Sequence, residues 1–134
     1  MTMSDLKSVV AVVDDDVRLL ESLTELLESA GHSVRLFSSA ASLLESDNLL
    51  ETDCLVSDVS MPVMDGFELR SLARAACPEL PVILMTGRHE IDDPQHAVGQ
   101  SYQSLFRKPF DSQALLVAIT EAVRSRARDT WRDK

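Results

Sequence analysis

Residues 54–66 read Cys54-Leu55-Val56-Ser57-Asp58-Val59-Ser60-Met61-Pro62-Val63-Met64-Asp65-Gly66, and this stretch decides the fold of the chain. Its short apolar start predicts a buried strand that ends on an acid, Asp58. Pro62 and Gly66 then interrupt the chain before a helical pattern begins. In open α/β sheets, ligands bind in the crevice beyond the C-terminal ends of the strands. Asp58 is therefore predicted to face such a crevice.

The composition indicates a single soluble domain with a substantial hydrophobic core. The chain has 134 residues, of which 45% are hydrophobic and 26% are charged, and this length fits a single domain. The formal net charge of -9 argues against general binding of nucleic acid or anionic membrane by this domain.

The location of the protein is predicted from features that the sequence lacks. No apolar run approaches the roughly 20 residues of a membrane span, and the first eight residues lack the apolar core of a signal peptide. Cys54 and Cys77 form no CxxC pair, which favours reduced, structural thiols. We therefore expect a cytoplasmic protein that has no membrane partner.

Apolar, β-branched runs alternate five times with helical patterns along the chain. Strands are predicted within 7–13 and at 33–37, 54–57, 82–85 and 104–107. Parallel strands need crossover connections, and these connections are right-handed. The predicted fold is an α/β three-layer sandwich of (βα)5 type with an all-parallel five-stranded sheet.

The helices are predicted from their apolar spacing and their end signals. In the first helix, Leu20, Leu23 and Leu27 repeat at helical spacing, one of the acids 14–16 caps its start, and Gly31 ends it. The second follows Ser38 or Ser39 and reaches Leu44 or Leu50, the third spans 67–76, and a short fourth starts near Pro94. The fifth follows Asp111 or Ser112, with its buried side formed by Leu115, Leu116, Ile119, Ala122 and Val123. The folded domain is predicted to cover 1–127, and 128–134 to form a polar tail or the start of a linker.

Polar side chains stand at four of the predicted strand ends. They are Asp14 and Asp15 after the first strand, Asp58 after the third, Thr86 after the fourth and Lys108 after the fifth. All C-terminal ends of a parallel sheet lie along one edge, so these groups are expected to converge.

This combination is suited to phosphoryl transfer. Three carboxylates in one pocket repel each other and need a cation, and oxygen ligands favour Mg²⁺. The metal would keep Asp58 ionised as a nucleophile. Thr86 and Lys108 could then supply a hydroxyl hydrogen bond and a positive charge to the phosphoryl oxygens.

The sequence resembles the receiver domains of two-component response regulators over about residues 8–126. The resemblance rests on four segments that occur in order, namely Val12-Val13-Asp14-Asp15-Asp16, Asp58-Val59-Ser60-Met61-Pro62 with Asp65-Gly66, Thr86-Gly87 and Lys108-Pro109-Phe110. It implies a flavodoxin-like strand order 2-1-3-4-5. The sequence around Asp58 and Thr86-Gly87 is most similar to that of the subgroup that controls nitrogen-fixation genes. Members of this subgroup often carry a C-terminal DNA-binding domain.

The resemblance also implies a role for each site residue. It makes Asp58 the phosphoacceptor, Thr86 the switch hydroxyl and Lys108 the phosphate-binding lysine, with a cis Lys108-Pro109 bond. The implied Mg²⁺ ligands are Asp14, Asp15, Asp58 and the backbone carbonyl of Ser60.

The implied partners follow from the same resemblance. The phosphoryl donor is a histidine kinase or a phosphotransfer protein, and a homodimer could form through helix 4, strand 5 and helix 5. The domain would be a signalling receiver that makes no direct contact with nucleic acid. It would catalyse only its own phosphorylation and dephosphorylation.

The chain departs from the family pattern at its expected output face. The second switch position, usually aromatic, is Leu105, and strand alternation should point the neighbouring Phe106 to the opposite face. Pro94 and Gly99 interrupt the fourth helix, and Ser101-Tyr102 replaces the usual Gly-Ala. These differences keep open a receiver-like interaction module that works without phosphorylation.

The sequence argues against two other functions. A phosphatase of the haloacid dehalogenase type would need an acid two residues after Asp58, where this chain has Ser60. A nucleotide-binding fold would need a glycine-rich loop after a strand, and none is present. Asp14 and Asp15 could be simple helix caps, and the three histidines (His32, His89 and His96) are predicted to be surface or loop residues.

Overall fold

The computed structural model describes residues 8–46, 49–87, 105–108 and 111–132, the last seven of these by their backbone alone. One sheet contains five strands, β1 (Val9–Val13), β2 (Ser33–Phe37), β3 (Cys54–Asp58), β4 (Val82–Thr86) and β5 (Leu105–Arg107). The strands are all parallel and their order is β2-β1-β3-β4-β5. The predicted fold class and strand order are therefore confirmed.

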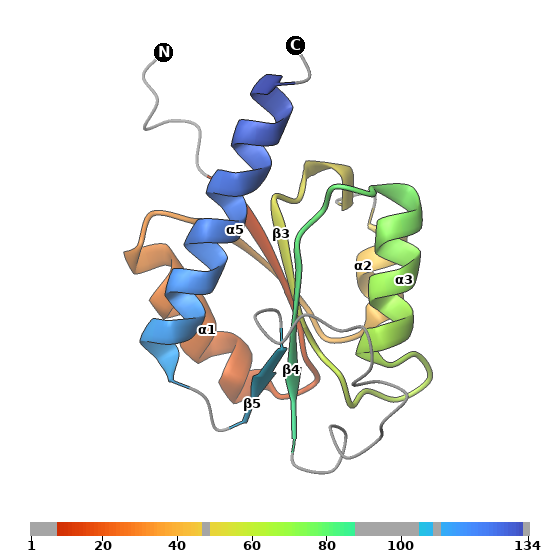
Figure 1. Cartoon of the computed structure of the whole chain (residues 1–134). Helices are drawn as coiled ribbons and strands as arrows, with labels where there is room; N and C mark the ends of the chain where they lie inside the picture. Colours follow the sequence, from red (N-terminus) through yellow and green to blue (C-terminus); the bar gives the residue numbers. More distant parts are fainter. Residues whose placement is uncertain (1–7, 47–48, 88–104, 109–110, 133–134) are drawn as a thin grey trace.

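The helices lie on both faces of this sheet (Figure 1). Helices α1 (Val17–Ser29) and α5 (Ser112–Arg132) cover one face, and α2 (Ala40–Glu45) and α3 (Gly66–Ala76) cover the other. A short 3-10 turn, Leu49–Glu51, leads into β3. The three layers follow from the sequence, because strands buried on both faces need an apolar helix face on each side.

Two apolar clusters form the core, one on each face of the sheet. Alternate residues of each strand point to opposite faces. Val10 and Val12 pack with Leu27 of α1 and Ile119 of α5 in what we call the α1/α5 cluster. Ala11 packs on the opposite face with residues of α2 and α3, in the α2/α3 core cluster. The predicted apolar side of the fifth helix lies against the α1/α5 cluster, as expected. Leu105 and Phe106 join opposite clusters, which confirms the predicted alternation in β5.

The helix ends are built as their residues predict. Asp16 caps α1 by accepting hydrogen bonds from the backbone N–H groups of Arg18 and Leu19. Gly31 adopts φ +92°, and its N–H donates to the carbonyl of Glu28, a left-handed ending that favours glycine. Ser39 caps α2, and the Asp111 carboxylate accepts hydrogen bonds from the first N–H groups of α5.

Several expectations need correction or lie outside the described residues. The second helix ends at Glu45, and Leu50 lies in the separate 3-10 turn with its side chain 74% exposed. His32 is in a loop but is buried, because the chain turns inward from α1 into β2. The fourth helix, the Lys108-Pro109 bond, His89 and His96 fall on residues outside the described ranges. The last helix continues to Arg132, beyond the predicted domain end at 127, so the domain boundary stays a prediction.

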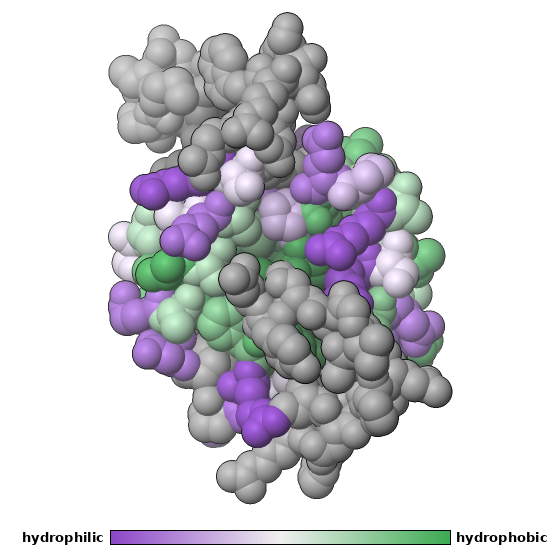
Figure 2. Space-filling model, in the orientation of Figure 1, coloured by the Kyte–Doolittle hydropathy of each residue, from purple (hydrophilic) through white to green (hydrophobic). Residues whose placement is uncertain are grey.

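The surface of the described part is predominantly polar. On the face in Figure 2, hydrophilic side chains lie over the two helical layers and more hydrophobic ones show between them. The large apolar side chains that are exposed among the described residues are Val17, Leu36, Leu50, Val63, Leu72 and Val117. Within the described ranges, no helix has both the length and the apolar character needed to cross a membrane.

Candidate functional site

The polar residues at the strand ends share one edge of the sheet. Asp14 directly follows β1, Asp58 ends β3, Thr86 ends β4 and Lys108 directly follows β5. Because β1, β3, β4 and β5 are neighbours in that order, their C-terminal ends meet at the lower edge of the sheet in Figure 1. The topology thus joins residues from both ends of the chain.

Lys108 lies between two buried carboxylates. Its Nζ is 3.1 Å from Oδ2 of Asp14 and 3.1 Å from Oδ1 of Asp58. Asp14 is 1% exposed and Asp58 is 5% exposed, whereas Asp15 is exposed to solvent. Carboxylate oxygens of these three acids all lie within 4.8 Å of one another. The structure therefore brings together four of the predicted site residues.

The three consecutive acids after β1 do different work. Oδ1 of Asp14 accepts a hydrogen bond of 2.9 Å from the N–H of Asp16, and the N–H of Asp14 donates to the carbonyl of Phe37 at the end of β2. Asp16 turns outward and caps α1. Asp14 is therefore fixed in the pocket, Asp15 lies at its rim, and the helix-cap interpretation holds only for Asp16.

The surroundings of Asp58 disfavour the charged form of its carboxyl group. Burial raises the pKa of the Asp58 carboxyl above its ordinary value, and the nearby Asp14 charge raises it further. The Lys108 ammonium and the backbone N–H of Ser60, which donates to this carboxyl, pull the pKa the other way but do not restore it. One lysine is thus too little for two buried carboxylates.

Lys108 responds to the same pair of acids. Burial on its own would lower the pKa of the Lys108 ammonium, but the contacts with Asp58 and Asp14 outweigh burial, and the pKa is raised. Lys108 therefore stays protonated at neutral pH and acts as a fixed positive charge.

The residues fit a hard divalent cation. Carboxylate oxygens are the ligands that Mg²⁺ prefers, and it keeps several of its own waters. The exposed Asp15 leaves the pocket open to such waters. A bound cation would also supply the positive charge that the raised pKa of Asp58 indicates is lacking.

Thr86 ends β4 beside β3 and is fully buried. Its hydroxyl donates a hydrogen bond of 3.1 Å to the carbonyl of Gly87. Its own carbonyl accepts one of 2.7 Å from the N–H of Lys108. The end of β4 is therefore tied directly to the residue that contacts both carboxylates.

Sequence reasoning missed the role of Gly66 and the burial of His32. A Cβ at Gly66 would lie 2.5 Å from the carbonyl oxygen of Asp58 and 2.9 Å from Cα of Val59, so the start of α3 touches the backbone of the phosphoacceptor candidate. The Asp-Gly pair before a helical pattern was the available signal. No signal in the sequence pointed to burial of His32.

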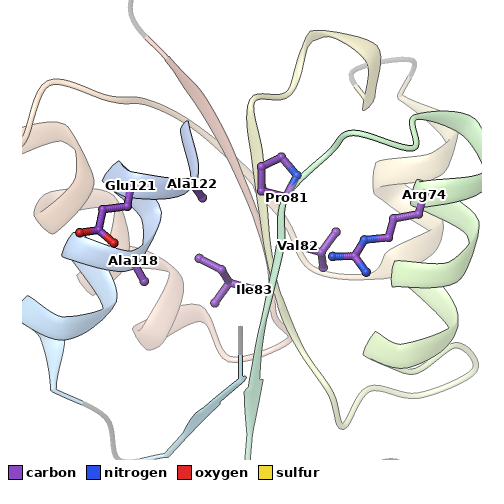
Figure 3. A pocket seen from close by; sticks show the side chains of 7 residues that line it. All are labelled: Arg74, Pro81, Val82, Ile83, Ala118, Glu121 and Ala122. Carbon is purple, nitrogen blue, oxygen red and sulfur yellow. The ribbon is translucent and has the colours of Figure 1, made fainter. Parts of the chain in front are cut away.

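A separate hollow of about 540 Å³ lies at the opposite end of β4 (Figure 3). It contains none of the clustered acids, so it is not part of the strand-end site. The described residues that line it are Arg74, Pro81, Val82, Ile83, Ala118, Glu121 and Ala122.

Comparisons with known proteins agree with this geometry. The family described as "Response regulator receiver domain" matches residues 10–120. Response regulator protein TodT of Pseudomonas putida is 36% identical over 122 residues, which are 91% of this chain and 54% of TodT. Transcriptional regulatory protein FixJ of Bradyrhizobium diazoefficiens is 36% identical over 118 residues, which are 88% of this chain and 58% of FixJ.

Solved structures give the same result. A response regulator receiver domain protein from Clostridium thermocellum superposes with a TM-score of 0.79 at 26% identity, and the match covers 90% of this chain and 97% of that one. Full-length FixJ from B. japonicum superposes with a TM-score of 0.75 at 35% identity, covering 90% of this chain and 59% of that one. The chain thus spans a little over half the length of these curated relatives.

The fold, the strand-end acids and these comparisons agree over nearly the whole described chain, and the similarity to FixJ matches the subgroup expected from the sequence. The chain belongs to the response regulator receiver domain family, the signalling domains of two-component systems.

Proposed function

We propose that this domain accepts a phosphoryl group on Asp58 in a Mg²⁺-dependent reaction and changes its partner contacts as a result. The observation that carries the proposal is the contact of one lysine with two buried carboxylates, Asp58 and Asp14, each 3.1 Å from Nζ of Lys108. A purely structural role would not require two such costly buried charges at one edge of the sheet.

The metal would be held by Asp14, Asp15, Asp58 and the backbone carbonyl of Ser60. When bound, Mg²⁺ supplies positive charge that offsets the repulsion among the carboxylates and the charge on the phosphoryl oxygens. Both oxygens of Asp14 are held in place, since one accepts the N–H of Asp16 and the other contacts Nζ of Lys108.

In the proposed reaction, a carboxylate oxygen of Asp58 attacks the phosphorus of a phosphohistidine. The P–O bond to Asp58 forms while the P–N bond to the donor histidine breaks. The imidazole keeps the electron pair of that bond and takes a proton from solvent. Burial of Asp58 serves this step because a poorly solvated carboxylate is easier to bring against phosphorus, provided that it stays ionised.

Lys108 would pair with the new phosphoryl oxygens. Its ammonium already lies 3.1 Å from the attacking carboxylate, so a small movement is enough to reach a phosphoryl group attached there. A compact charge on a flexible stem is suited to this change of partner.

Thr86 would convert phosphorylation into a change of shape. Its hydroxyl now donates to the carbonyl of Gly87, and in the proposed switch it donates to a phosphoryl oxygen instead. Because the carbonyl of Thr86 accepts the N–H of Lys108, a movement of Thr86 would shift the backbone at the end of β5. The output would reach β5, α5 and the fourth helix predicted from the sequence, where a homodimer could form.

The proposed donor is a histidine kinase or a phosphotransfer protein. Relatives such as FixJ are named transcriptional regulatory proteins and are nearly twice the length of the matched region. A role in transcription would therefore belong to a longer protein, with nucleic acid bound elsewhere than on this acidic domain.

The proposal is tested by intact mass after incubation with acetyl phosphate, with and without Mg²⁺. The expected result is addition of one phosphoryl group to the wild type in Mg²⁺ only, and none to Asp58→Asn. If no addition occurs and the phosphoryl mimic beryllofluoride also fails to bind, the phosphoacceptor role is wrong. The beryllofluoride test is included because a phosphoryl group on Asp58 that hydrolyses quickly would escape detection by mass.

One observation favours a second candidate, a module that binds its partner without phosphorylation. The position three residues before Lys108 holds Leu105, which packs against the α2/α3 core cluster and offers no aromatic ring to rotate. Equal binding of a partner by the wild type and by Asp58→Asn would favour this alternative.

A further inference from the structure

The loop between β3 and α3 is fastened at both of its ends. At its start, the N–H of Val59 donates to the carbonyl of Met85 in β4. At its end, the N–H of Gly66 donates to the carbonyl of Val59 at 2.9 Å, and the backbone of Gly66 rests against that of Asp58. Asp65 and Glu68 form a reciprocal capping box that fixes the start of α3. The few residues between these points must reverse the chain within a fixed span.

The reversal is made by a tight turn at Val63. The N–H of Met64 donates to the carbonyl of Pro62 at 2.8 Å, and the residue between them, Val63, has φ +71°. An i to i+2 hydrogen bond around a positive φ is the rare and strained form of the γ-turn. Val63 is the only residue other than glycine with positive φ among the described residues. A β-branched side chain is among the least suited to this conformation.

The side chain of Val63 gives the turn no support. It is fully exposed, with a relative accessibility of 103%, whereas its neighbours Met61 and Met64 pack against the α2/α3 core cluster. Strained backbone persists only where the surroundings impose it. Here the loop ends, which are held by hydrogen bonds, impose the turn, and the exposed side chain of Val63 adds no packing against the rest of the described chain.

We propose that Val63 is a positioning residue that weakens Mg²⁺ binding by straining the loop. The inference rests on the proposed function, in which the carbonyl of Ser60 in this loop is a metal ligand. In the turned form, the N–H of Ser60 donates to the Asp58 carboxylate, so this end of the loop lies against the acid cluster. Strain at Val63 favours a relaxed form in which φ of residue 63 is negative and the Ser60 backbone is displaced.

The consequence is a coupling between loop order and the metal. A ligand that binds only one of two forms shows an affinity reduced by the fraction of the protein in that form. Replacing Val63 by a residue that tolerates positive φ should raise this fraction. Mg²⁺ should then bind more tightly, although no ligand of the metal has been altered.

The test compares Val63→Asn with Val63→Thr. Asparagine tolerates the left-handed region, and its side chain is polar like that of threonine. Threonine keeps the β-branch and hence the strain, so it controls for the loss of apolar surface. Mg²⁺ is titrated at constant ionic strength while the amide NMR signals of residues 59–66 are followed, and thermal unfolding is measured alongside.

We expect Val63→Asn to bind Mg²⁺ about three- to tenfold more tightly than the wild type, and Val63→Thr to match the wild type. Equal affinities in all three proteins would overturn the inference, even if Val63→Asn unfolds at a higher temperature, because the strain would then be real but unconnected to the metal. A wild type that binds no Mg²⁺ would overturn the proposed metal site and this inference with it. The two failures are distinguished by the wild-type titration alone.

Discussion

Replacement of Gly66 by alanine should destabilise the protein, although alanine is the better helix former. Gly66 is the first residue of α3, and an added Cβ would lie 2.5 Å from the carbonyl oxygen of Asp58 and 2.9 Å from Cα of Val59. Both obstacles are backbone atoms, so no side-chain rotation can relieve them. Real Cβ atoms essentially never come closer than 3.0 Å to such atoms, so α3 must move away from β3 by at least about 0.5 Å.

The magnitude follows from two opposing terms. Overpacking of a close-packed site costs about 1–3 kcal/mol, while alanine in a helix gains up to about 1 kcal/mol over glycine. With about 2 kcal/mol for overpacking and about 0.5 kcal/mol for the gain from alanine at a helix end, the net loss is about 1.5 kcal/mol. For a domain of this size, such a loss lowers the unfolding temperature by roughly 4–8 °C.

The assay is thermal unfolding followed by circular dichroism, combined with phosphorylation by acetyl phosphate. Gly31→Ala is the control, because Gly31 has φ +92° and an added Cβ there would meet no atom of the described residues within 4 Å. It should lose stability through backbone strain alone and leave phosphorylation unchanged, whereas Gly66→Ala should impair both. Unfolding of Gly66→Ala at or above the wild-type temperature would refute the reasoning about the backbone contact.

Two further predictions concern charge. Lys108→Met should raise the pKa of Asp58 further in the metal-free protein, because the ammonium group that lowers this pKa is removed. The pKa can be measured by NMR titration of the Asp58 carboxyl group. An unchanged or lower pKa would contradict the pairing of Lys108 with Asp58. Burial lowers the pKa of His32 in the folded protein, partly offset by Asp53, so the unfolded state binds the proton more readily and stability should fall as pH drops below about 6.5. Urea unfolding at several pH values should show a smaller loss in His32→Gln than in the wild type, and parallel curves would count against this account.

The electrostatic prediction for His32 has a direct structural basis. Neither ring nitrogen of His32 has a hydrogen-bond partner within the described part of the chain. A buried imidazole without partners strongly disfavours the charged form. The effect is therefore expected even though the nearby Asp53 carboxylate favours the proton.

The sequence alone determined the layers and the location of the site. Residues 9–13 are apolar and mostly β-branched, and residues 54–56 are apolar, as expected for strands covered on both faces. Asp14, Asp58, Thr86 and Lys108 follow or end such strands, and parallel strands place their ends on one edge whatever the details of packing. The strand order came from resemblance to a known family, since alternation of strands and helices permits several orders.

Only the tertiary structure decided which atoms meet. Among three consecutive acids, Asp14 became the buried partner of Lys108 and Asp16 became the helix cap. Lys108 lies 94 residues away from Asp14 in the sequence, so this pairing exists only once β1 and β5 share one sheet. The exact helix limits at Glu45 and Arg132 likewise depend on packing that local propensity does not contain.

The strain at Val63 and the burial of His32 are the two features that the sequence predicts least. Local preference predicts negative φ for valine, and the positive value occurs in a loop whose two ends are held by backbone hydrogen bonds of Val59 and Gly66. His32 is buried because Leu27 and Gly31 direct the chain inward from α1 to β2. A sequence pattern specifies what each segment prefers on its own, whereas conformations imposed by distant contacts exist only once the whole chain has folded.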